Sequence, residues 1–369
     1  RDAERASGLK ETALQEGSRA GPYFFNEPNR VRKTPEDARS ALVGAAPRRQ
    51  QMQNSLELGS SRVSHATADD NQLFVKAAWR TIPFLFVCYV VSFLDRINIG
   101  FAQLQMKHDL GFSDAMYGLG AAVFYIGYVL CEVPSNMLLA KYGARRTFTR
   151  IMLLWGAASV SMMFVSKPSH FYFMRFMLGV FEAGFFPGIV LYLTYWFPAN
   201  RRAAVMSVFF AGVAVAGVLG GLMSGWIMRD MGGVLGLYGW QWMFALEGAP
   251  ALLLAFVAFF YLVDKPQDAR WLSDAQKRRL VALCTQNDGG PQSRSAHDTR
   301  SFAAALVNPR VYLFAFIYFS LTCASLTLNF WMPLMIRDFG IKDVVQVSLY
   351  TVIPNAIGAV GLVLIARRS

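Results

Sequence analysis

Residues 173–198 read FMRFMLGVFEAGFFPGIVLYLTYWFP, an apolar run long enough to cross a lipid bilayer as a helix. Two charged residues, Arg175 and Glu182, interrupt the run. A charged side chain at the centre of a spanning helix costs about 2.5 to 3.5 kcal/mol on insertion scales, so it usually faces a protein interior or a water-filled cavity. The run therefore predicts a membrane-spanning helix whose charges handle an ion, a proton or a substrate.

Apolar runs of this kind recur along the chain from Arg80 onward. We predict spanning helices at about 80–102, 115–138, 147–166, 170–196, 203–228, 242–263, 311–335 and 347–366. The composition agrees, because 54% of the residues are hydrophobic and 16% are charged, whereas soluble domains carry about 25% charged residues. Only helices satisfy the backbone groups of spans of this length in lipid, so we expect an all-α membrane protein.

The placement of basic residues predicts the orientation of the spans. The formal net charge is +12, but most basic residues lie in the polar N-terminal tail and in short loops between apolar runs. The loops after the second and fourth spans carry Lys141, Arg145, Arg146, Arg150, Arg201 and Arg202. By the positive-inside rule the N-terminus is cytoplasmic, and the basic charge does not indicate a nucleic-acid partner.

The pattern of spans and polar stretches predicts four parts. They are a disordered cytoplasmic tail (1–78), an N-terminal six-helix bundle (79–263), a cytoplasmic loop between bundles (264–310) and the start of a C-terminal bundle with two helices (311–369). Two six-helix bundles need twelve spans, of which about eight are present in this chain. Either the chain is a fragment or its last four helices were lost.

Two details of the polar stretches carry separate expectations. The chain begins with Arg1, whereas Met52 opens an ordinary cytoplasmic lead-in to the first span. We therefore hypothesise that residues 1–51 are non-native or a mis-assigned extension. In the long loop, Ser273 is positioned as the N-cap of a short surface helix at about 274–286.

Two further charges, Asp95 and Arg96, lie inside the first predicted span. Arg175 and Glu182 share a helix face but are about 10.5 Å apart along the axis, so they are not a self-contained pair. Arginine suits carboxylate recognition because its planar fork donates two parallel hydrogen bonds and stays charged. We predict that Arg96 and Arg175 bind an anion, and that Asp95 and Glu182 take up and release protons.

Structural roles compete with these predictions. Asp95 could simply neutralise Arg96 or Arg175 to hold two helices together, and Glu182 could be a permanently protonated structural group. Tyr125, in the middle of the second span, could orient a bound carboxylate, or it could pack with its hydroxyl satisfied locally.

Asn98 and Glu247 are also polar residues in apolar surroundings. For Asn98 we prefer a hydrogen bond between helices. We treat Glu247 as a structural or gating residue, because it lies about one turn from the predicted outer end of its span.

Several blocks of sequence, in order, resemble a known family. They are FLDRINIGFA (93–102), GYVLCEVPSNMLL (127–139), residues 173–198, WQWMFALEGAPA (240–251), ARWLSDAQKRR (269–279) and NFWMP (329–333). The loop NMLLAKYGARRTFTR (136–150) is similar to the loop motif of the major facilitator superfamily, although Ala140 and Asn136 replace its acid and its leading glycine. Together the blocks resemble the anion:cation symporters of that superfamily, and among them the bacterial tartrate, phthalate and sugar-acid permeases.

The resemblance implies a fold of two six-helix bundles and proton-coupled symport of a small organic carboxylate by alternating access. It implies a multi-pass protein of the bacterial inner membrane. We expect a monomer in the lipid bilayer that needs no cofactor, with a proton rather than sodium as the co-transported ion. In the family, the matching acids are associated with proton coupling and the matching arginines with substrate.

Other classes of function remain open at this point. A ligand sensor that does not transport could be built on the same scaffold and signal through the loop 264–310, although that loop is short for a signalling domain. The chain could also be an inactive truncated fragment. An enzyme is disfavoured, because no nucleophile–base pair and no metal-ligand cluster is visible among the spans. We therefore predict no catalytic residue and no metal site.

Overall fold

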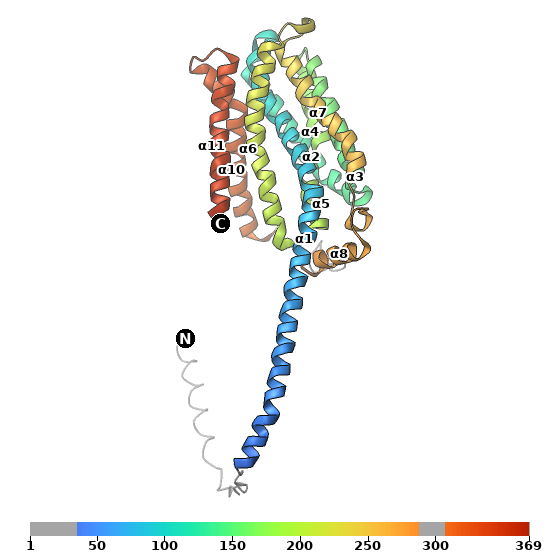
Figure 1. The fold of residues 1–369 in the computed structure, drawn as a ribbon. Helices are drawn as coiled ribbons and strands as arrows, with labels where there is room; N and C mark the ends of the chain where they lie inside the picture. The colour runs from blue at the N-terminus through green and yellow to red at the C-terminus, as the bar shows by residue number, and fades with distance from the viewer. Residues whose placement is uncertain (1–34, 288–306, 369) are drawn as a thin grey trace, which may run out of the picture. The chain divides into compact units, whose positions relative to one another are not determined.

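The computed structural model describes residues 35–287 and 307–368, and within these ranges the regular structure is entirely helical. The longer helices are α1 (Pro35–Asp109), α2 (Asp114–Tyr142), α3 (Ala144–Ser161), α4 (Pro168–Glu182), α5 (Phe185–Trp196), α6 (Ala199–Asp230), α7 (Gly239–Tyr261), α8 (Asp274–Asn287), α10 (Pro309–Asp338) and α11 (Val344–Arg368), as Figure 1 shows. Three short 3-10 helices are η1 (Met162–Phe164), η2 (Val234–Gly236) and η3 (Pro266–Asp268).

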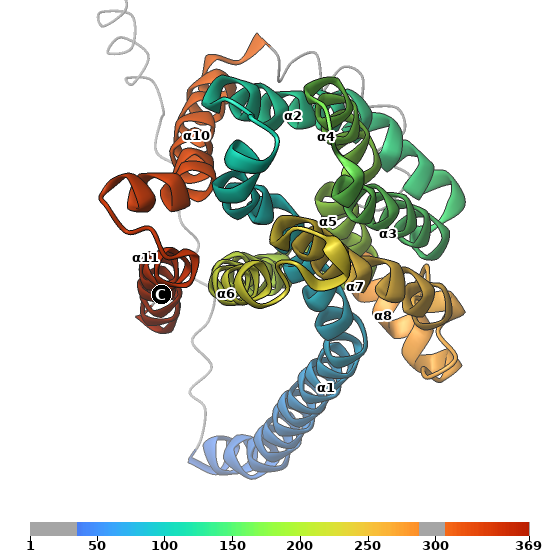
Figure 2. The ribbon, with the colours of Figure 1, turned by 90° about the horizontal axis from the view of Figure 1, so that it is seen from above.

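The predicted all-α membrane fold is confirmed. In the described residues, eight segments are long and apolar enough to cross a membrane, and they correspond to the eight predicted spans. The chain divides into two units, residues 1–66 and 67–369, and all eight spans lie in the second. Seen from above, α10 and α11 lie beside α2 and α6 (Figure 2). The division of the spans into an N-terminal bundle (79–263) and a C-terminal bundle (311–369) stays a prediction.

The fourth span differs from its prediction, because it is two helices rather than one helix over 170–196. α4 ends at Glu182 and α5 begins at Phe185, with Gly184 between them in the left-handed conformation at φ 82°. A side chain at Gly184 would also lie 2.5 Å from the Cβ of Ser135 on α2. Glycine tolerates both the positive φ and the close approach. The break places Glu182 at the last turn of α4.

Close helix packing at small residues holds the spans around this break. The two most extensive contacts between helices of the described chain are that of α2 with α4 and that of α3 with α7. At the first, Gly127 lies so close to α4 that an added Cβ would be 2.6 Å from the carbonyl oxygen of Phe176. At the second, a Cβ on Gly156 would be 3.0 Å from the backbone nitrogen of Leu252. Small residues let backbones approach in this way, which compensates for the lack of a hydrophobic driving force between helices in lipid.

Gly179→Ala is expected to destabilise the protein by about 1 to 3 kcal/mol, as overpacking of a well-packed core does. An added Cβ at Gly179 would overlap the backbone carbonyl oxygen of Phe124, which cannot move as a side-chain end can. Gly358→Ala on α11 is the control, because nothing lies within 4 Å of a Cβ there. Thermal unfolding in detergent should show a lower Tm for Gly179→Ala and an equal or higher Tm for the control. Equal stabilities would contradict the tight packing of α2 on α4.

The structure also differs from the predicted disordered tail, 1–78. Residues 1–34 lie outside the described residues, and residues 35–78 belong to α1. Within 69–78, Leu73, Phe74 and Ala77 are buried, and the ring of Phe74 packs on Phe197 with 6.4 Å between centroids. These apolar positions continue one face of the first span toward the N-terminus, so burial favours helix where composition alone indicates disorder.

The predicted surface helix of the long loop is confirmed as α8. The Ser273 hydroxyl accepts a hydrogen bond from the backbone N–H of Gln276 (3.3 Å), and the Gln276 side chain accepts one from the Ser273 N–H (3.2 Å). This reciprocal arrangement is a capping box. Arg279 of α8 donates two hydrogen bonds of 2.8 Å to Asp70 of α1, which attaches α8 to the start of the first span. Residues 288–306 of the loop lie outside the described residues.

Candidate functional site

The structure buries a cluster of polar and charged side chains where α1, α3, α4, α6 and α7 meet. Its most deeply buried members are Asp95, Asn98, Arg175, Glu182 and Glu247, each with no more than 2% of its surface exposed. Burial of so many ionisable groups is expensive, and such groups are therefore paired or functional.

Arg96 and Glu182 form an ion pair between α1 and α4. The Arg96 Nε lies 2.8 Å from the Glu182 Oε1, and the Ser92 hydroxyl donates to the same oxygen at 2.7 Å. The Glu182 side chain is fully buried and its Oε2 has no hydrogen-bond partner, whereas the Arg96 side chain is 15% exposed. Ser92 precedes Arg96 by one helical turn, so both groups share the face of α1 that meets Glu182.

Aromatic rings surround the Arg96 guanidinium. Its Cζ lies 5.0 Å from the ring centroid of Tyr128, 5.2 Å from that of Phe93 and 6.0 Å from that of Phe124. A guanidinium on aromatic faces is stabilised without a second carboxylate. Arg96 can therefore stay charged in this setting when Glu182 is neutral.

Asp95 points away from Arg96, to α3. It accepts hydrogen bonds from the indole nitrogen of Trp155 and from the Ser159 hydroxyl (2.7 Å), and a longer one from the Asn98 amide (3.4 Å). In the described residues Asp95 forms no ion pair with Arg96 or Arg175, although its charge interacts with that of Arg175 at longer range. Consecutive helical residues point about 100° apart, which separates Asp95 from its neighbour Arg96.

Arg175 lies on the other side of the cluster, buried between α4 and α2. Its Nε donates to the backbone carbonyl of Gly120 (3.3 Å), and its Cζ lies 4.7 Å from the ring centroid of Phe124. Its Nη2 is buried without a hydrogen-bond partner. Phe124 therefore contacts both arginines, and Arg175 keeps one guanidinium nitrogen that nothing in the described residues satisfies.

Tyr125 is half-buried next to this arrangement. Its ring packs edge-on against Phe124 (5.0 Å) and against Phe330 of α10 (6.3 Å). Its hydroxyl is buried with no hydrogen-bond partner and interacts electrostatically with both Arg96 and Arg175. The alternative in which the hydroxyl is satisfied locally is therefore not observed in the described residues.

The structure joins the five predicted site residues into two connected groups rather than one network. One group is the Arg96–Glu182 pair with Tyr125 and Arg175 around Phe124, and the other is Asp95 with its donors on α3. The sequence prediction missed Trp155 and Ser159 as partners of Asp95, although their spacing of four places them on one face of α3. It also missed Ser92.

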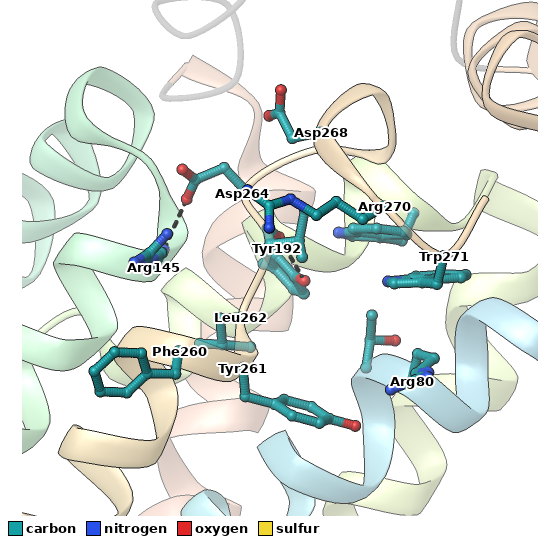
Figure 3. A pocket seen from close by; sticks show the side chains of 13 residues that line it. Arg80, Arg145, Tyr192, Phe260, Tyr261, Leu262, Asp264, Asp268, Arg270 and Trp271 are labelled. Atoms are coloured by element: carbon teal, nitrogen blue, oxygen red, sulfur yellow. Dashed lines mark hydrogen bonds between the residues drawn. The ribbon is translucent and has the colours of Figure 1, made fainter. Parts of the chain in front are cut away.

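A cavity at one end of the spans is separate from the buried charges. It has a volume of about 800 Å³ and is lined by Arg80 and Thr81 within α1, by the C-terminal ends of α5 and α7, and by the start of the long loop (Figure 3). At its edge Asp264 accepts a hydrogen bond from the backbone N–H of Arg145 (2.8 Å), the first turn of α3, and Trp271 stacks on Trp196. None of the predicted site residues lines this cavity. It therefore belongs to the boundary region of the spans and not to the charged cluster.

Comparison with known proteins agrees with this architecture. The family model of the Major Facilitator Superfamily matches residues 85–369. The chain is 43% identical to the "Putative metabolite transport protein NicT" of Pseudomonas putida over 310 residues, which are 84% of this chain and 69% of the relative. It is 45% identical to a "Putative tartrate transporter" of Agrobacterium vitis over 300 residues, 81% of this chain and 68% of the relative.

Solved structures show the same fold at low sequence identity. The "Partially occluded inward open conformation of the xylose transporter XylE from E. coli" matches with a TM-score of 0.54 and 15% identity, covering 76% of this chain and 72% of that chain. A bacterial homologue of the human lysosomal transporter Spinster matches with a TM-score of 0.55 and 20% identity, covering 78% of this chain and 61% of that chain.

The fold, the spans and the relatives lead to one class of protein. The eight candidate membrane helices of the described residues make it a multi-pass membrane protein, and relatives named as transporters make it a transporter of a small molecule rather than an enzyme. The chain belongs to the Major Facilitator Superfamily.

Proposed function

We propose that this protein is a symporter that moves an organic carboxylate together with protons by alternating access. The observation that carries the proposal is the ion pair between Arg96, which is partly exposed, and Glu182, which is fully buried. The names of the relatives, among them a putative tartrate transporter and a putative metabolite transport protein, support an organic anion as the substrate.

The Arg96–Glu182 pair explains how a proton and an anion can bind together. While Glu182 is ionised, it occupies the Nε of Arg96 and competes with any other carboxylate for the guanidinium. A proton on Glu182 removes that competition, and the substrate carboxylate then takes its place. A hydrogen bond to a charged group is worth about 1.5 to 3 kcal/mol, so a proton at this site would strengthen anion binding by about 10- to 100-fold.

The remaining predicted site residues fit a substrate with a second polar end. Within the described ranges, the Arg175 Nη2 and the Tyr125 hydroxyl have no hydrogen-bond partner, and both residues contact the phenyl ring of Phe124 that Arg96 also contacts. A second carboxylate can use the free Arg175 nitrogen, and a substrate hydroxyl can pair with Tyr125. Hydroxylated dicarboxylates and sugar acids have both groups. Arg175 is buried, so we infer that it becomes accessible when the helices rearrange.

Asp95 is proposed as a second proton-coupling group. It is buried and forms no ion pair in the part of the chain that the structure describes, and a buried carboxylate without an ion pair is costly in its ionised form. Its two shorter hydrogen bonds come from α3, so its protonation would act on the α1–α3 contact while that of Glu182 acts on Arg96. We propose a proton rather than sodium as the co-transported ion, and a mechanism that needs no cofactor.

The membrane context of the proposal follows from the basic loops. We propose a location in the bacterial inner membrane with a cytoplasmic N-terminus, because the loops after the second, fourth and sixth spans hold most of the basic residues between spans. A monomer is sufficient for this mechanism. A sensor that does not transport has no specific observation in its favour, and the named relatives are transporters.

Uptake in proteoliposomes tests the proposal directly. Labelled tartrate, phthalate and galactonate are offered with and without an inward proton gradient. At least one of them should accumulate, and only when the gradient is present. Uptake of all three independent of the gradient, or of none of them, would contradict proton symport of these anions.

A further inference from the structure

The cavity at one end of the spans is lined by basic side chains that the proposed transport mechanism does not use. They are Arg80 of α1, Arg145 of α3 and Arg270 of the long loop. Arg145 and Arg270 also belong to two of the stretches that resemble the family, 136–150 and 269–279. Figure 3 shows Arg145 and Arg80 on opposite sides of the cavity, with Arg270 between them. Three positive charges from three parts of the chain therefore surround one space.

The two acids of the cavity do not pair with these arginines. Asp264 accepts a hydrogen bond of 2.8 Å from the backbone N–H of Arg145, so its charge is engaged at the N-terminus of α3. Asp268 is exposed, and Figure 3 shows its carboxylate at the edge of the cavity. In the described residues, neither acid forms an ion pair with an arginine of the cavity. The cavity therefore has guanidinium groups available for an anion.

One of these guanidinium groups is held in place and keeps an unused donor. The Arg145 Cζ lies 4.4 Å from the ring centroid of Phe259, and the Arg145 Nε is buried without a hydrogen-bond partner. A buried donor without an acceptor is costly, and an anion in the cavity would supply acceptor oxygens. Arginine is suited to phosphate because its planar fork donates two parallel hydrogen bonds.

The wall opposite the solvent is ordered by contacts between distant parts of the chain. Trp271 of the long loop stacks on Trp196 of α5, with 5.6 Å between ring centroids and 12° between ring planes. The Tyr192 hydroxyl donates to the backbone carbonyl of Val263 at 2.9 Å. All four residues line the cavity, so its shape is fixed before a ligand binds.

The surroundings of the cavity favour a membrane lipid over a soluble anion. Phe260 lines the cavity, and Phe256 and Leu253 precede it by about one and two turns on the same face of α7. Their exposed fractions are 68%, 69% and 70%, so they form an apolar stripe that leads to the cavity along a membrane-spanning helix. Trp79 and Tyr261 are exposed at the same end of the spans, as aromatic residues at the level of the lipid headgroups are.

We propose that the cavity binds the headgroup of an anionic phospholipid whose acyl chains lie along the stripe of Leu253, Phe256 and Phe260. The phosphate accepts hydrogen bonds from Arg145 and Arg270, and Arg80 adds positive charge. Basic pockets between spanning helices recognise anionic headgroups in this way. In the proposed orientation, the lipid comes from the cytoplasmic leaflet.

The bound lipid joins three parts of the chain at one point, because its phosphate contacts α1, α3 and the long loop. The inference goes beyond the proposed function, since lipid binding is measured without transport. Absence of gradient-driven uptake would contradict proton symport and leave the lipid result as it stands.

Native mass spectrometry of the purified protein in detergent tests the proposal. Phosphatidylglycerol and phosphatidylcholine with identical acyl chains are added separately, because only the first has a net negative charge. An arginine near the membrane surface strengthens binding of an anionic lipid about fivefold, so three of them predict an affinity for phosphatidylglycerol about 100-fold higher than for phosphatidylcholine. Equal affinities for the two lipids would overturn the proposal.

Substitutions at exposed positions place the bound lipid in the cavity without disturbing the core. Arg270→Gln should weaken phosphatidylglycerol binding about fivefold, and Arg80→Gln together with Arg270→Gln about 25-fold, while phosphatidylcholine binding stays unchanged. The control Arg278→Gln removes the same charge from an exposed position of α8 outside the cavity, and it should change neither affinity. Unchanged phosphatidylglycerol binding in the double substitution would overturn the proposal.

Inorganic phosphate distinguishes a lipid from a soluble anion, because it has the charge of the headgroup and no acyl chain. It should not displace phosphatidylglycerol when both are present at equal concentration. Displacement under that condition would show that the cavity binds a soluble anion, and it would overturn the assignment of a lipid.

Discussion

Glu182→Gln is expected to abolish accumulation driven by a proton gradient while leaving exchange of substrate across the membrane. Glutamine cannot release a proton, so position 182 stays neutral and Arg96 remains available to the substrate carboxylate. The Ser92 hydroxyl can still donate to the side-chain oxygen at this position, which keeps the local packing. Uptake with a gradient should fall to the level measured without one, and counterflow of labelled for unlabelled substrate should continue.

The control for this prediction is Asp230→Asn, which removes an exposed acid at the end of α6. It should leave both gradient-driven uptake and counterflow unchanged. If Glu182→Gln accumulates substrate as well as the unmodified protein does, Glu182 is not a coupling group. If it also loses counterflow, Glu182 is needed for binding or for folding, and proton competition for Arg96 does not describe the site.

Arg96→Ala is expected to have a large effect on both stability and transport. It leaves Glu182 buried without its cation, and breaking a buried pair in this way costs about 3 to 5 kcal/mol. It also removes the proposed carboxylate ligand, so uptake should fall about 100-fold. Thermal unfolding in detergent and initial rates of uptake measure the two effects separately.

The double substitution Arg96→Ala with Glu182→Gln separates two effects of losing Arg96. One is the loss of stability from an unpaired Glu182 charge, and the other is the loss of uptake from the missing carboxylate ligand. It should recover much of the stability lost in Arg96→Ala, because no unpaired anion remains, yet it should not recover uptake. The control Arg278→Ala removes an exposed arginine of α8 and should change neither quantity. If Arg96→Ala and the double substitution are equally stable, the unpaired charge of Glu182 does not account for the stability lost in Arg96→Ala.

Removal of the Glu182 carboxylate and removal of the Arg96 guanidinium are not expected to lower the stability of the protein equally. Arg96 is partly exposed and has three aromatic faces within about 6 Å, so it can remain charged without Glu182. Among the described residues, Glu182 accepts hydrogen bonds only from Arg96 and from the Ser92 hydroxyl. Loss of the acid should therefore cost less stability than loss of the arginine.

The eight spans could be predicted because spanning is a local property of the chain. About 20 consecutive apolar residues suffice to cross the bilayer, whatever the remainder of the protein does. The same holds for α8, whose start is determined by Ser273 and Gln276, three positions apart. The tail was less predictable, because the burial of Phe74 depends on Phe197, which is distant in the sequence.

The break in the fourth span shows a limit of the same reasoning. Gly184 and Pro187 are visible in the sequence, but both residues are tolerated inside membrane helices. The break follows from the conformation of Gly184 and from the closeness of Ser135 on α2, which no pattern within residues 173–198 contains.

The order of the residues was enough to predict a helical membrane protein with charges inside its spans, because hydropathy and charge are local properties of the chain. It also indicated which side chains are candidates for a site. The partners of those charges depend on the packing of the helices. Glu182 pairs with Arg96, Asp95 accepts hydrogen bonds from Trp155 and Ser159, and Glu247 accepts one from Ser224. These partners come from different helices, and the direction in which each side chain points depends on how the helices pack.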